Sequence, residues 1–523
     1  MMFEVDQELQ ALIMECQKPE MLTLLPNSFE LAPGFIGVPH TLDTCIRLAA
    51  MGYTPPSPME YQYHWPHDKT FFEEPFSHQI KTSGFAAMNP HCYILNGMGT
   101  GKTLSAAWLA DYLIECGYGP RVLIVSPLST LERVWGDALF IHFRHRSFAI
   151  LHGAAAKRKK LLAEKKDFYV INHAGVGVIA KELGQRPDID IIIIDEVAVY
   201  RNKQTDMWKA INGIIYPGKE AKPKTYVIGL TGAPIPNSPE DAYGQCKLVT
   251  PHTVPQYFTG WRNMVMEHQS TYVWTPRREA TKIVYEAMRP AIRFSRDECL
   301  DLPPCVYQTR DVEMSSEQAR HYKQVMKELS TEVQGGKVTA MNEGVKLSKL
   351  LQIACGVVYD SAGVAREIDC GNRVEVLMEI IEQVSEKVIV FVPFTAVTGM
   401  LYRELSKYWE FAVVTGETPI KERDQIFSRF QDPNSKLDIV AHPGCMAHGL
   451  TLTEASTIIW YAPIDSNDIY GQANARITRP GQKFTANIVN MAGSAVERRS
   501  YKRLELRQSN QGLLLDMIAR GER

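Results

Sequence analysis

Short runs of β-branched and other apolar residues alternate with segments of helical periodicity from about residue 90 onward. The first series of runs comprises CYIL, RVLIVSP, FYVIN, IDIIIIDE and TYVIGLTG. The second series lies much later and comprises KVIVFVP, FAVVTG, LDIVAH, STIIWYA and NIVNMAG. Such runs, separated by helical segments, are typical of parallel sheets covered by helices on both faces. The pattern therefore predicts an α/β fold with two parallel-sheet lobes in tandem.

The stretch between the two series, residues 251–370, lacks the periodicity of strands. Two of its segments, SSEQARHYKQVMKELSTEV and EGVKLSKLLQIACGV, have helical spacing. We therefore predict a largely helical insertion between the lobes and a small separate module at the N-terminus. The predicted divisions are an acidic, proline-rich N-terminal module (1–70), lobe 1 (71–252), the insertion (253–370) and lobe 2 with a C-terminal helix (371–523).

Composition is that of an ordinary globular chain of two or three domains, with 523 residues, 45% hydrophobic and 22% charged. No apolar run approaches the ~18 residues of a membrane-spanning helix. The first ten residues, MMFEVDQELQ, carry acidic groups where a secretory signal carries basic ones. We therefore expect a cytoplasmic protein with no membrane role. The ten cysteines are scattered without a Cys-x-x-Cys pair, so we expect reduced thiols.

Charge is distributed unevenly, although the net value is only −2. Residues 1–80 hold 3 basic and 11 acidic residues, so the rest of the chain has a net charge of +6. Positive charge is concentrated in residues 144–166 and 471–507, each with eight basic residues. The segment AAAKRKKLLAEKK fits a solvated helix face and a phosphate-binding surface equally well.

The segment ILNGMGTGKT, residues 94–103, has the pattern of a phosphate-binding loop, between the run CYIL and a predicted helix that stops at Gly117. In this setting backbone N–H groups and the helix N-terminus converge on nucleotide phosphates. The strict pattern has glycine where this chain has Asn96, and asparagine adopts the left-handed backbone conformation more readily than other non-glycine residues. Lys102 would neutralise phosphate charge, and Thr103 would ligate Mg²⁺. The predicted nucleotide-binding residues of the loop are Asn96, Gly97, Met98, Gly99, Thr100, Gly101, Lys102 and Thr103.

An acidic pair ends the run IDIIIIDE, whose four consecutive isoleucines indicate a strand buried on both faces. Asp195 is predicted to hold Mg²⁺ at the nucleotide, and Glu196 to act as the general base that deprotonates the attacking water. An acidic pair at the end of a strand is commonly only the solvated start of a loop. The position of this pair after a phosphate-binding loop favours the catalytic interpretation.

Positive charge for the departing phosphate is available in GQANARITRPGQ. Its Arg476 and Arg479 are three residues apart, which predicts that they share one face of a helix. Guanidinium groups that arrive from another lobe act as arginine fingers and contribute roughly 10³ to 10⁵ in rate. We therefore predict an active site in a cleft between the lobes, complete only when the lobes close.

From about residue 75 to 510, the motifs resemble in order those of the Swi/Snf-type ATPases of helicase superfamily two, particularly the compact bacteriophage forms. The resemblance implies two RecA-like lobes. The family's loop, Asp-Glu-Met-Gly-Leu-Gly-Lys-Thr, also lacks the first glycine, which accounts for Asn96. The motifs that carry the resemblance are PFSHQ, NGMGTGKT, VLIVSPLSTLERVW, DEVAVYRN, LTGAPIPNSPEDAYGQCKLVTP, CLDLPP, KLLQIACG, KVIVFVPF, VVTGETPIKERDQIFSRF, HPGCMAHGLTLTEAS and GQANARITRPGQ.

The resemblance assigns roles to further residues of these motifs. It implies that Gln79 recognises the adenine base and that Thr231 and Gln472 couple the two lobes. The chain departs from the family pattern at Ala198, where histidine is usual, and at Thr451, where asparagine is common. We expect the first departure to remove a polar link between the magnesium site and the second lobe, and the second to affect a local contact.

The activity implied by the resemblance is ATP-driven movement along double-stranded DNA, with branched DNA as a further substrate, in phage DNA replication, recombination or repair. The expected cofactors are ATP and Mg²⁺, bound by a monomer in the host cytoplasm. No histone-reading module is seen in the sequence, so a histone substrate is not expected. Two alternatives stay open: a strand-separating or branch-migrating helicase, and an ATP-gated DNA clamp with little hydrolysis. A small-molecule kinase would leave the second lobe unexplained.

Overall fold

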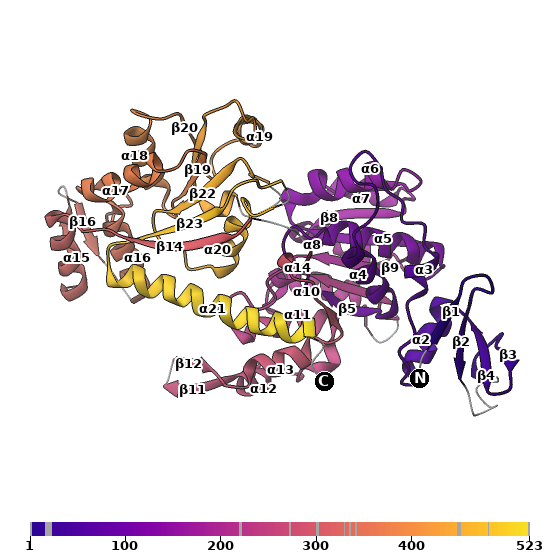
Figure 1. Cartoon of the computed structure of the whole chain (residues 1–523). Coiled ribbons are helices and arrows are strands. Elements are labelled where there is room, and N and C mark those ends of the chain that lie inside the picture. Colours follow the sequence, from indigo (N-terminus) through magenta and orange to yellow (C-terminus); the bar gives the residue numbers. More distant parts are fainter. Residues whose placement is uncertain are drawn as a thin grey trace. The chain divides into compact units, whose positions relative to one another are not determined.

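The structure is a computed structural model of the chain (Figure 1). It divides into two compact units, Met1–Cys299 with Gln511–Arg523, and Leu300–Asn510. Each unit contains one large parallel sheet, which confirms the predicted α/β fold with two RecA-like lobes, and the N-terminal module adds a small antiparallel sheet. The residues that the structure describes are 3–15, 24–218, 222–270, 273–299, 303–328, 330–333, 336–339, 343–446, 451–479 and 481–520.

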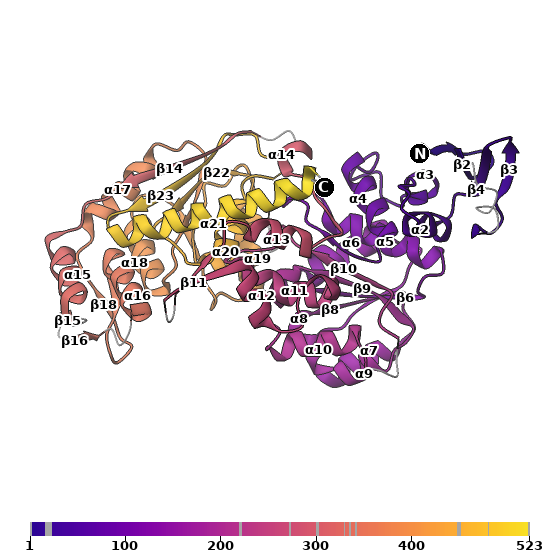
Figure 2. The same ribbon diagram turned by 90° about the horizontal axis from the view of Figure 1, so that it is seen from below.

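Seven parallel strands form the sheet of the first unit, in the order β13-β5-β10-β9-β6-β8-β7, with helices on both faces (Figures 1 and 2). In β9, Ile191 and Ile193 belong to one hydrophobic core, whereas Ile192 and Ile194 belong to the other. Both faces of β9 are therefore buried, as the run of isoleucines predicted. The strands are β5 (His91–Ile94), β6 (Arg121–Ser126), β7 (Phe148–Ile150), β8 (Phe168–Asn172), β9 (Ile189–Asp195), β10 (Tyr226–Leu230) and β13 (Ala291–Ile292).

The five apolar runs predicted for the first lobe are the strands β5, β6, β8, β9 and β10. Helices connect these strands and cover the sheet. They are α4 (Ser77–Met88), α5 (Lys102–Glu115), α6 (Asp137–His142), α7 (Ala155–Ala163), α8 (His173–Val178), α9 (Ala180–Gly184), α10 (Asp206–Ile215), α11 (Ala242–Val249), α12 (Phe258–Val265), α13 (Ala280–Ala287) and α14 (Arg296–Cys299).

Residues 253–299, which the sequence pattern assigned to the insertion, complete the first unit. Strand β13 pairs in parallel with β5 and places Ala291 opposite Tyr93. Trp261 of α12 and Tyr285 of α13 are buried in a core of the same sheet. Between these helices, β11 (Met266–Ser270) and β12 (Val273–Pro276) form a hairpin. A strand of two residues has too few positions to show periodicity, so the sequence did not reveal this edge of the sheet.

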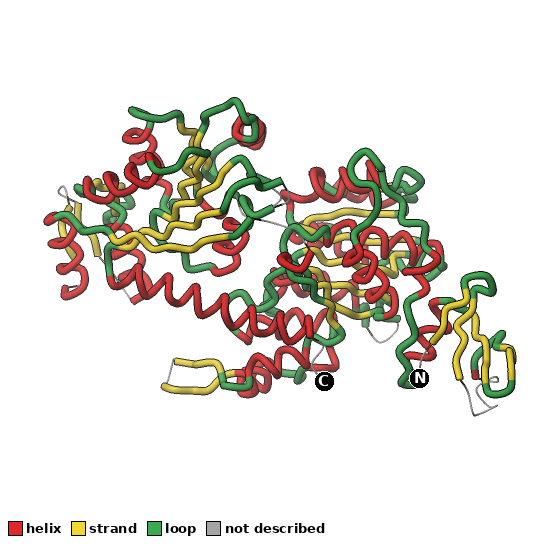
Figure 3. Tube along the Cα trace, viewed as in Figure 1, coloured by secondary structure: helices red, strands yellow, loops and turns green. Residues whose placement is uncertain are grey.

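The second unit contains a six-stranded parallel sheet in the order β14-β23-β22-β19-β21-β20, whose strands Figure 3 shows in yellow. Five of these strands are the runs of the second predicted series. The sixth, β14, pairs with β23 at the sheet edge and is mostly exposed, which explains why no apolar run marks it. The strands are β14 (Cys305–Asp311), β19 (Lys387–Phe391), β20 (Phe411–Val414), β21 (Asp438–Ala441), β22 (Ala455–Trp460) and β23 (Ala486–Ala492).

Four helices lie between residue 370 and β23. They are α17 (Gly371–Glu382), α18 (Thr395–Leu405), α19 (Ile420–Phe430) and α20 (Asn467–Asn474). After β23, helix α21 (Ala495–Arg520) begins in the second unit, and its residues from Gln511 onward belong to the first. The side chains between the sheet and these helices form two further cores, which contain Val390 and Ile389 of β19, respectively. Alternate residues of β19 therefore face opposite sides, as in β9.

The two helical segments predicted between the series are α15 (Ser316–Glu328) and α16 (Glu343–Ala354), which share a satellite core. The helix predicted to continue to residue 333 is wrong at its end, because Ser330–Val333 forms β15 and pairs with β16 (Gly336–Thr339). The β-branched residues of β15 favour the extended backbone. A second hairpin follows, formed by β17 (Val357–Tyr359) and β18 (Ala365–Glu367).

The N-terminal module is a four-stranded antiparallel sheet in the order β1-β2-β4-β3. On β2, Leu12 and Met14 are buried while Glu15 is exposed, which is the alternation of a half-buried strand. The two buried side chains share a small core with Val38 and Leu48. The elements of this module are β1 (Phe3–Asp6), β2 (Ala11–Glu15), β3 (Phe29–Ala32), β4 (Phe35–Pro39), α2 (Leu42–Ala50) and α3 (Pro58–Gln62).

Across the described ranges, every helix is too short or too polar to span a bilayer. The same ranges contain nine cysteines, all of them free thiols. Five of these thiols are buried, and Cys116 is exposed.

Candidate active site

The loop between β5 and α5 has a backbone that requires glycine at two positions. Gly99 and Gly101 have φ angles of +83° and +79°. At Gly101 a Cβ atom would also lie 2.0 Å from Nε2 of Gln79. Helix α5 begins at the next residue, Lys102, and a left-handed Gly117 follows its C-terminus. The strand, loop and helix expected around ILNGMGTGKT are therefore present, and the N–H groups of the first helical turn lie at the loop.

The φ angle of Asn96 is not positive, so its backbone does not have the left-handed conformation that asparagine readily adopts. The residue is fully buried, and its amide group joins two other segments. Its Nδ2 donates to Oγ1 of Thr82 at 2.8 Å, and its Oδ1 accepts from the N–H of Phe294 at 2.9 Å. The side chain of Asn96 thus links the loop to α4 and to the segment after β13. At the adjacent Gly97, a Cβ atom would lie 2.8 Å from the backbone nitrogen of Arg296, so this segment packs directly on the loop.

Helix α4 brings Gln79 against the same loop. The Oε1 atom of Gln79 accepts from the N–H of Phe76 at 3.1 Å, and its Nε2 lies 3.5 Å from the carbonyl oxygen of Thr100. His78 reaches the same carbonyl, with its Nε2 at 2.9 Å. Adenine recognition by Gln79 stays a prediction, and His78 is a neighbour that the sequence did not single out.

Lys102, the first residue of α5, is directed back toward the loop. Its ammonium group donates to the carbonyl oxygens of Asn96 and Gly97, at 2.9 and 3.0 Å. The segment that follows β10 lies close by. A Cβ atom at Gly232 would be 3.4 Å from Cγ of Met98 and 3.8 Å from Nζ of Lys102. The motif LTGAPIPNSPEDAYGQCKLVTP, which contains Gly232, therefore lies beside the phosphate-binding loop.

Asp195 lies at the end of β9, beside this loop in the sheet. Its Oδ2 accepts from Nε1 of Trp135 at 2.9 Å. Burial raises the pKa of Asp195, and the hydrogen bond from Trp135 and the charge of Lys102 offset part of that rise. Trp135 is fully buried in a π-helical turn and was not identified from the sequence, because nothing in its motif indicates which strand it contacts.

Glu196 has a left-handed backbone, with φ 59° and ψ 56°. This conformation is strained for a glutamate, by about 1 kcal/mol or more, and such strain is concentrated at functional sites. Its Oε1 accepts from Oγ1 of Thr231 at 2.5 Å, and the same hydroxyl accepts from the N–H of Ala233 at 3.0 Å. The predicted base and the predicted coupling threonine are therefore bonded to each other within the first unit.

These residues meet because β5, β10 and β9 are neighbours in the sheet and their carboxyl ends share one edge. The hydroxyl of Thr103 and the carboxylate of Asp195 are the oxygen ligands that Mg²⁺ prefers. At Gly97 and Gly101 the absence of a Cβ atom lets Arg296 and Gln79 pack closely against the loop. The residues present thus fit a complex of Mg²⁺ and a nucleotide in their donor chemistry.

Gln472, Arg476 and Arg479 belong to the second unit, and the helix predicted for the two arginines is wrong. Helix α20 ends at Asn474, before either arginine. Pro480 follows Arg479 in the sequence, and a proline disfavours helical backbone in the residue before it. Gln472 lies on α20 and is buried.

Both guanidinium groups are held where burial disfavours their charge. Burial and the neighbouring Arg479 hold the pKa of Arg476 well below its ordinary value, and burial lowers the pKa of Arg479 to about 10. Arg479 donates from Nη1 to Oγ1 of Thr451 at 3.1 Å. Threonine thus supplies a contact at the position where asparagine is common in the family. Residues 447–450 of that motif and Pro480 lie outside the described residues.

Ala198 is 3% exposed, in the short 3₁₀ turn Val197–Tyr200 that follows Glu196. A small apolar side chain fills this position. Loss of a polar link there stays a prediction.

The first basic stretch is used in part for internal bonds. Arg158 is buried and donates to the carbonyl oxygens of Leu151 and Gly153, both at 2.8 Å. Lys159 pairs with Glu182 at 2.6 Å. Other lysines of α7 are exposed, so only part of this helix is open to phosphate contacts.

Comparison with known proteins agrees with this arrangement of motifs. Residues 85–357, more than half of the chain, match the model of the SNF2-related domain, and residues 372–481 match the helicase conserved C-terminal domain. The chain belongs to the SNF2-related family of ATPases. In this chain the SNF2-related match covers the phosphate-binding loop, Asp195, Glu196 and Thr231. The helicase C-terminal match covers Gln472 and both arginines.

Several relatives of this SNF2-related chain are known. Protein p41 of Acyrthosiphon pisum secondary endosymbiont phage 1 is 24% identical over 303 residues, which are 56% of this chain and 65% of p41. Protein CHROMATIN REMODELING 5 of Arabidopsis thaliana is 24% identical over 442 residues, 76% of this chain and 24% of that protein. A solved structure, the Sulfolobus solfataricus SWI2/SNF2 ATPase core in complex with dsDNA, is 22% identical with a TM-score of 0.40 and covers 86% of this chain and 94% of that one. This chain thus spans about two thirds of p41 and about a quarter of the plant protein.

Proposed function

We propose that this chain hydrolyses ATP and uses the reaction to move along double-stranded DNA, as a translocase of the Swi/Snf type. The observation that carries the proposal is that three groups lie at one edge of the parallel sheet: the loop after β5 with Lys102, the end of β9 with Asp195 and Glu196, and Thr231 after β10. Membership of the SNF2-related family supports the same function. A role in phage DNA replication, recombination or repair is part of the proposal and rests on the resemblance to phage forms.

In the proposed reaction, Lys102 exchanges its two backbone acceptors for phosphate oxygens of ATP. A charge-assisted bond to phosphate is stronger than a bond to a neutral carbonyl, so the exchange favours binding. The first N–H groups of α5 add the positive end of the helix dipole. Bound Mg²⁺, held by Thr103 and Asp195, would neutralise further phosphate charge. Gln79, beside the loop, is the proposed contact of the adenine base.

Glu196 is the proposed general base and accepts a proton from the attacking water. The hydroxyl of Thr231 holds one oxygen of its carboxylate at 2.5 Å and so fixes the direction of the group. The left-handed backbone at Glu196 restricts the same side chain from its main-chain end. A base that is fixed in advance needs no reorganisation at the moment of proton transfer.

The helicase C-terminal domain supplies the remaining proposed groups. We infer that Arg476 and Arg479 stabilise the negative charge of the departing γ-phosphate and that Gln472 takes part in coupling. Burial disfavours both cations, and an anion close to them would offset that penalty. ATP would therefore favour a closed arrangement that hydrolysis releases, and this cycle would drive movement along DNA.

The direct test is steady-state ATPase activity at one ionic strength with no nucleic acid, single-stranded DNA, duplex DNA, branched DNA or RNA. We expect the largest stimulation with duplex DNA, weakened by salt because the contacts are to phosphates. Lys102→Ala should lower turnover by at least ~10²-fold by weakening nucleotide binding. Lys181→Ala, at an exposed lysine of α9, is the matched control and should leave the rate unchanged. An ATPase rate that is the same with and without each polynucleotide would contradict the proposal.

Translocation and strand separation need separate assays. Displacement of a triplex-forming strand without unwinding of the duplex beneath it would support translocation. ATP-dependent release of a labelled strand from a forked duplex would instead favour the helicase alternative. In both assays Lys102→Ala reports the ATP-independent background.

A further inference from the structure

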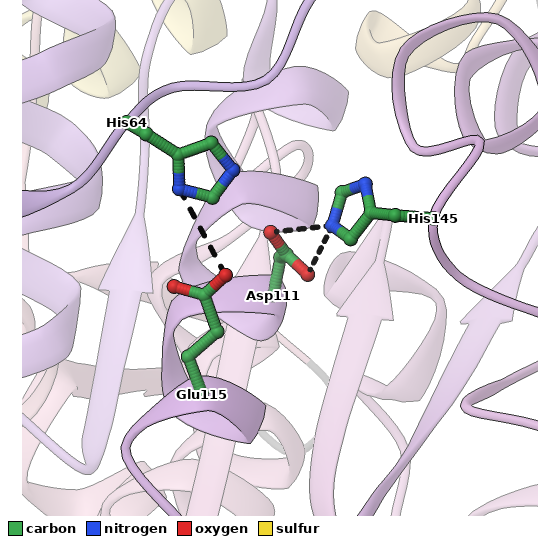
Figure 4. A group of neighbouring side chains, drawn as sticks. All are labelled: His64, Asp111, Glu115 and His145. Atoms are coloured by element: carbon green, nitrogen blue, oxygen red, sulfur yellow. Dashed lines mark hydrogen bonds and ion pairs between the residues drawn. The ribbon is translucent and has the colours of Figure 1, made fainter.

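Four side chains of metal-binding type gather on the first unit, and the proposed ATP mechanism uses none of them. One ligand atom from each of His64, Asp111, Glu115 and His145 lies within 4.8 Å of the others (Figure 4). Asp111 and Glu115 are four residues apart on α5, so they share one face of the helix. They lie about 14 Å or more along the helix axis from Lys102, at 1.5 Å per residue. The two histidines come from segments outside that helix.

We propose that this cluster binds a divalent transition-metal ion of the zinc class. Two imidazoles and two carboxylates supply the four ligands of a tetrahedral site. Two imidazoles argue against Ca²⁺ and Mg²⁺, which prefer oxygen ligands throughout. With bonds of about 2.0–2.1 Å, the ligand atoms of such a site are roughly 3.4 Å apart. The cluster therefore has to contract at its widest point when the ion binds.

The side chains of this cluster are arranged so that three of them can close on the fourth. Those of His64, Glu115 and His145 are 55%, 38% and 40% exposed, whereas that of Asp111 is completely buried. Exposed side chains change rotamer at little cost. Asp111 is held by the hydroxyl of Tyr63 at 2.5 Å, which acts as an outer partner that orients a ligand.

Charge at the cluster also favours a cation, although Arg146 brings positive charge to the same place. Its Nε donates to Oδ1 of Asp111 at 2.5 Å, and its Nη2 is 3.9 Å from Oε1 of Glu115. With both histidines neutral, the two carboxylates and Arg146 sum to a charge of −1. A divalent ion changes the total charge from −1 to +1 and balances the repulsion between the two carboxylates.

An ion-pair network without metal is the competing explanation of the same contacts. Nε2 of His145 lies 3.1 and 3.2 Å from the two carboxylate oxygens of Asp111, where a protonated imidazole would donate. A metal takes the place of that proton, so binding must release protons and weaken as the pH falls. Metal titration therefore distinguishes the two explanations.

The metal would join three parts of the first unit that are far apart in sequence. His64 follows α3 in the segment that leaves the N-terminal module, and His145 lies in the loop after α6. All four positions would be taken by protein ligands, which is the property of structural rather than catalytic zinc sites.

The experiment is a titration of the full chain with Co²⁺ and then Zn²⁺, after treatment with a chelator and desalting. We expect one equivalent of Co²⁺ to release protons as it binds and to give the visible absorption of a tetrahedral site, and Zn²⁺ to displace the Co²⁺ and remove that absorption. His64→Ala, His145→Ala and Glu115→Gln should each weaken binding by ~10-fold or more. These positions are partly exposed, so the variants should fold. His252→Ala, at an exposed histidine outside the cluster, is the matched control and should bind normally.

Two results would overturn the proposal. Absence of the Co²⁺ absorption would leave only an ion-pair network, and an affinity unchanged in His64→Ala and His145→Ala would place the ion outside the cluster. Cys116 follows Glu115 directly and is an exposed free thiol. If Cys116→Ser removes binding while the histidine variants retain it, the ion belongs to the thiol and not to the cluster. None of these measurements depends on ATP hydrolysis.

Discussion

The two units hold their candidate catalytic residues in different ways. In the first, Glu196 is fixed by a hydrogen bond from Thr231, and Asp195 by one from Trp135. In the second, Arg476 and Arg479 come after the end of a helix, and burial lowers the pKa of both. Burial disfavours the charge of Asp195 as well as that of the two arginines, but neighbouring groups offset part of this penalty at Asp195 and not at the arginines.

This difference suggests a division of work under the proposed mechanism. Groups that are fixed in advance serve to bind and orient ATP. A cation whose charge is disfavoured gains more from a developing negative charge than a solvated cation does, so it acts mainly in the transition state. We therefore expect substitutions in the second unit to slow chemistry and those in the first to affect binding, stability or proton transfer.

The largest effect is expected at Arg479. Arg479→Ala should lower the single-turnover rate by about 10³-fold or more, in the range of other arginine fingers, with little change in ATP affinity. Single-turnover hydrolysis and equilibrium nucleotide binding measure the two quantities separately. Lys483→Ala, at an exposed cation of the same segment, is the control and should behave as the unmodified chain. Equal losses of affinity and rate would assign Arg479 to the ground state and remove the contrast between the units.

Glu196→Gln tests the opposite half of the comparison. Glutamine keeps the oxygen that accepts from Thr231 but cannot take a proton, so turnover should fall by roughly 10²–10⁴-fold. ATP affinity, measured by equilibrium binding, should be retained. Thr231→Val should cost less, because the base remains and only its orientation is lost. Near-normal hydrolysis by Glu196→Gln would refute its assignment as the base.

Much of the fold could be predicted because the information is local. Ten apolar runs became strands of the two parallel sheets, and the loop before α5 followed from its glycines and lysine. What the sequence did not reveal depends on contacts between distant segments. The short strand β13 has no periodicity, and the motifs that contain Trp135 and Asn96 do not indicate which distant groups these side chains contact. The spacing of Arg476 and Arg479 is compatible with a helix, but α20 ends at Asn474, and Pro480 disfavours helical backbone at Arg479.

Asn96 offers a test of that distinction. If its amide joins Thr82 and Phe294, Asn96→Ala removes the donor to the buried hydroxyl of Thr82 and the acceptor of the part-buried N–H of Phe294, while that hydroxyl still donates to the carbonyl oxygen of His78. The free energy of unfolding of the first unit should then fall by about 2–3 kcal/mol in urea denaturation. Asn96→Gly should be at least as damaging, although the loop pattern has glycine there. Asn263→Ala, at an exposed asparagine of the same unit, is the control. A stabilising Asn96→Gly would favour the backbone explanation instead.

The smallest effect concerns one aspartate in each large sheet. Each of these aspartates lies near the start of an interior strand. Asp190 of β9 accepts from both the N–H and the hydroxyl of Thr225, at 2.8 and 2.5 Å. Asp438 of β21 accepts from the N–H of Val388 at 2.8 Å, and burial raises its pKa to about 7 despite that bond and the charge of Lys387. The hydrogen bonds of Asp190 should stabilise its unit, whereas the buried charge of Asp438 should destabilise its unit.

The sign at Asp438 follows from its raised pKa. Below about pH 4 the carboxyl is protonated in both states and has no effect. Between about pH 4 and 7 the unfolded chain ionises while the folded unit keeps its proton, so stability falls as pH rises, and above pH 7 the penalty is constant.

Asp438→Asn should therefore raise the free energy of unfolding of the second unit by ~1–2 kcal/mol at pH 8, against an upper bound of ~4 kcal/mol from the shift alone. Guanidinium denaturation at pH 8 and pH 4 measures the gain, which should vanish at the lower pH. Asp190→Asn should instead destabilise the first unit by about 1 kcal/mol, because it weakens the two hydrogen bonds from Thr225. A gain at Asp438→Asn that is equal at both pH values would mean that lost charge is not its cause.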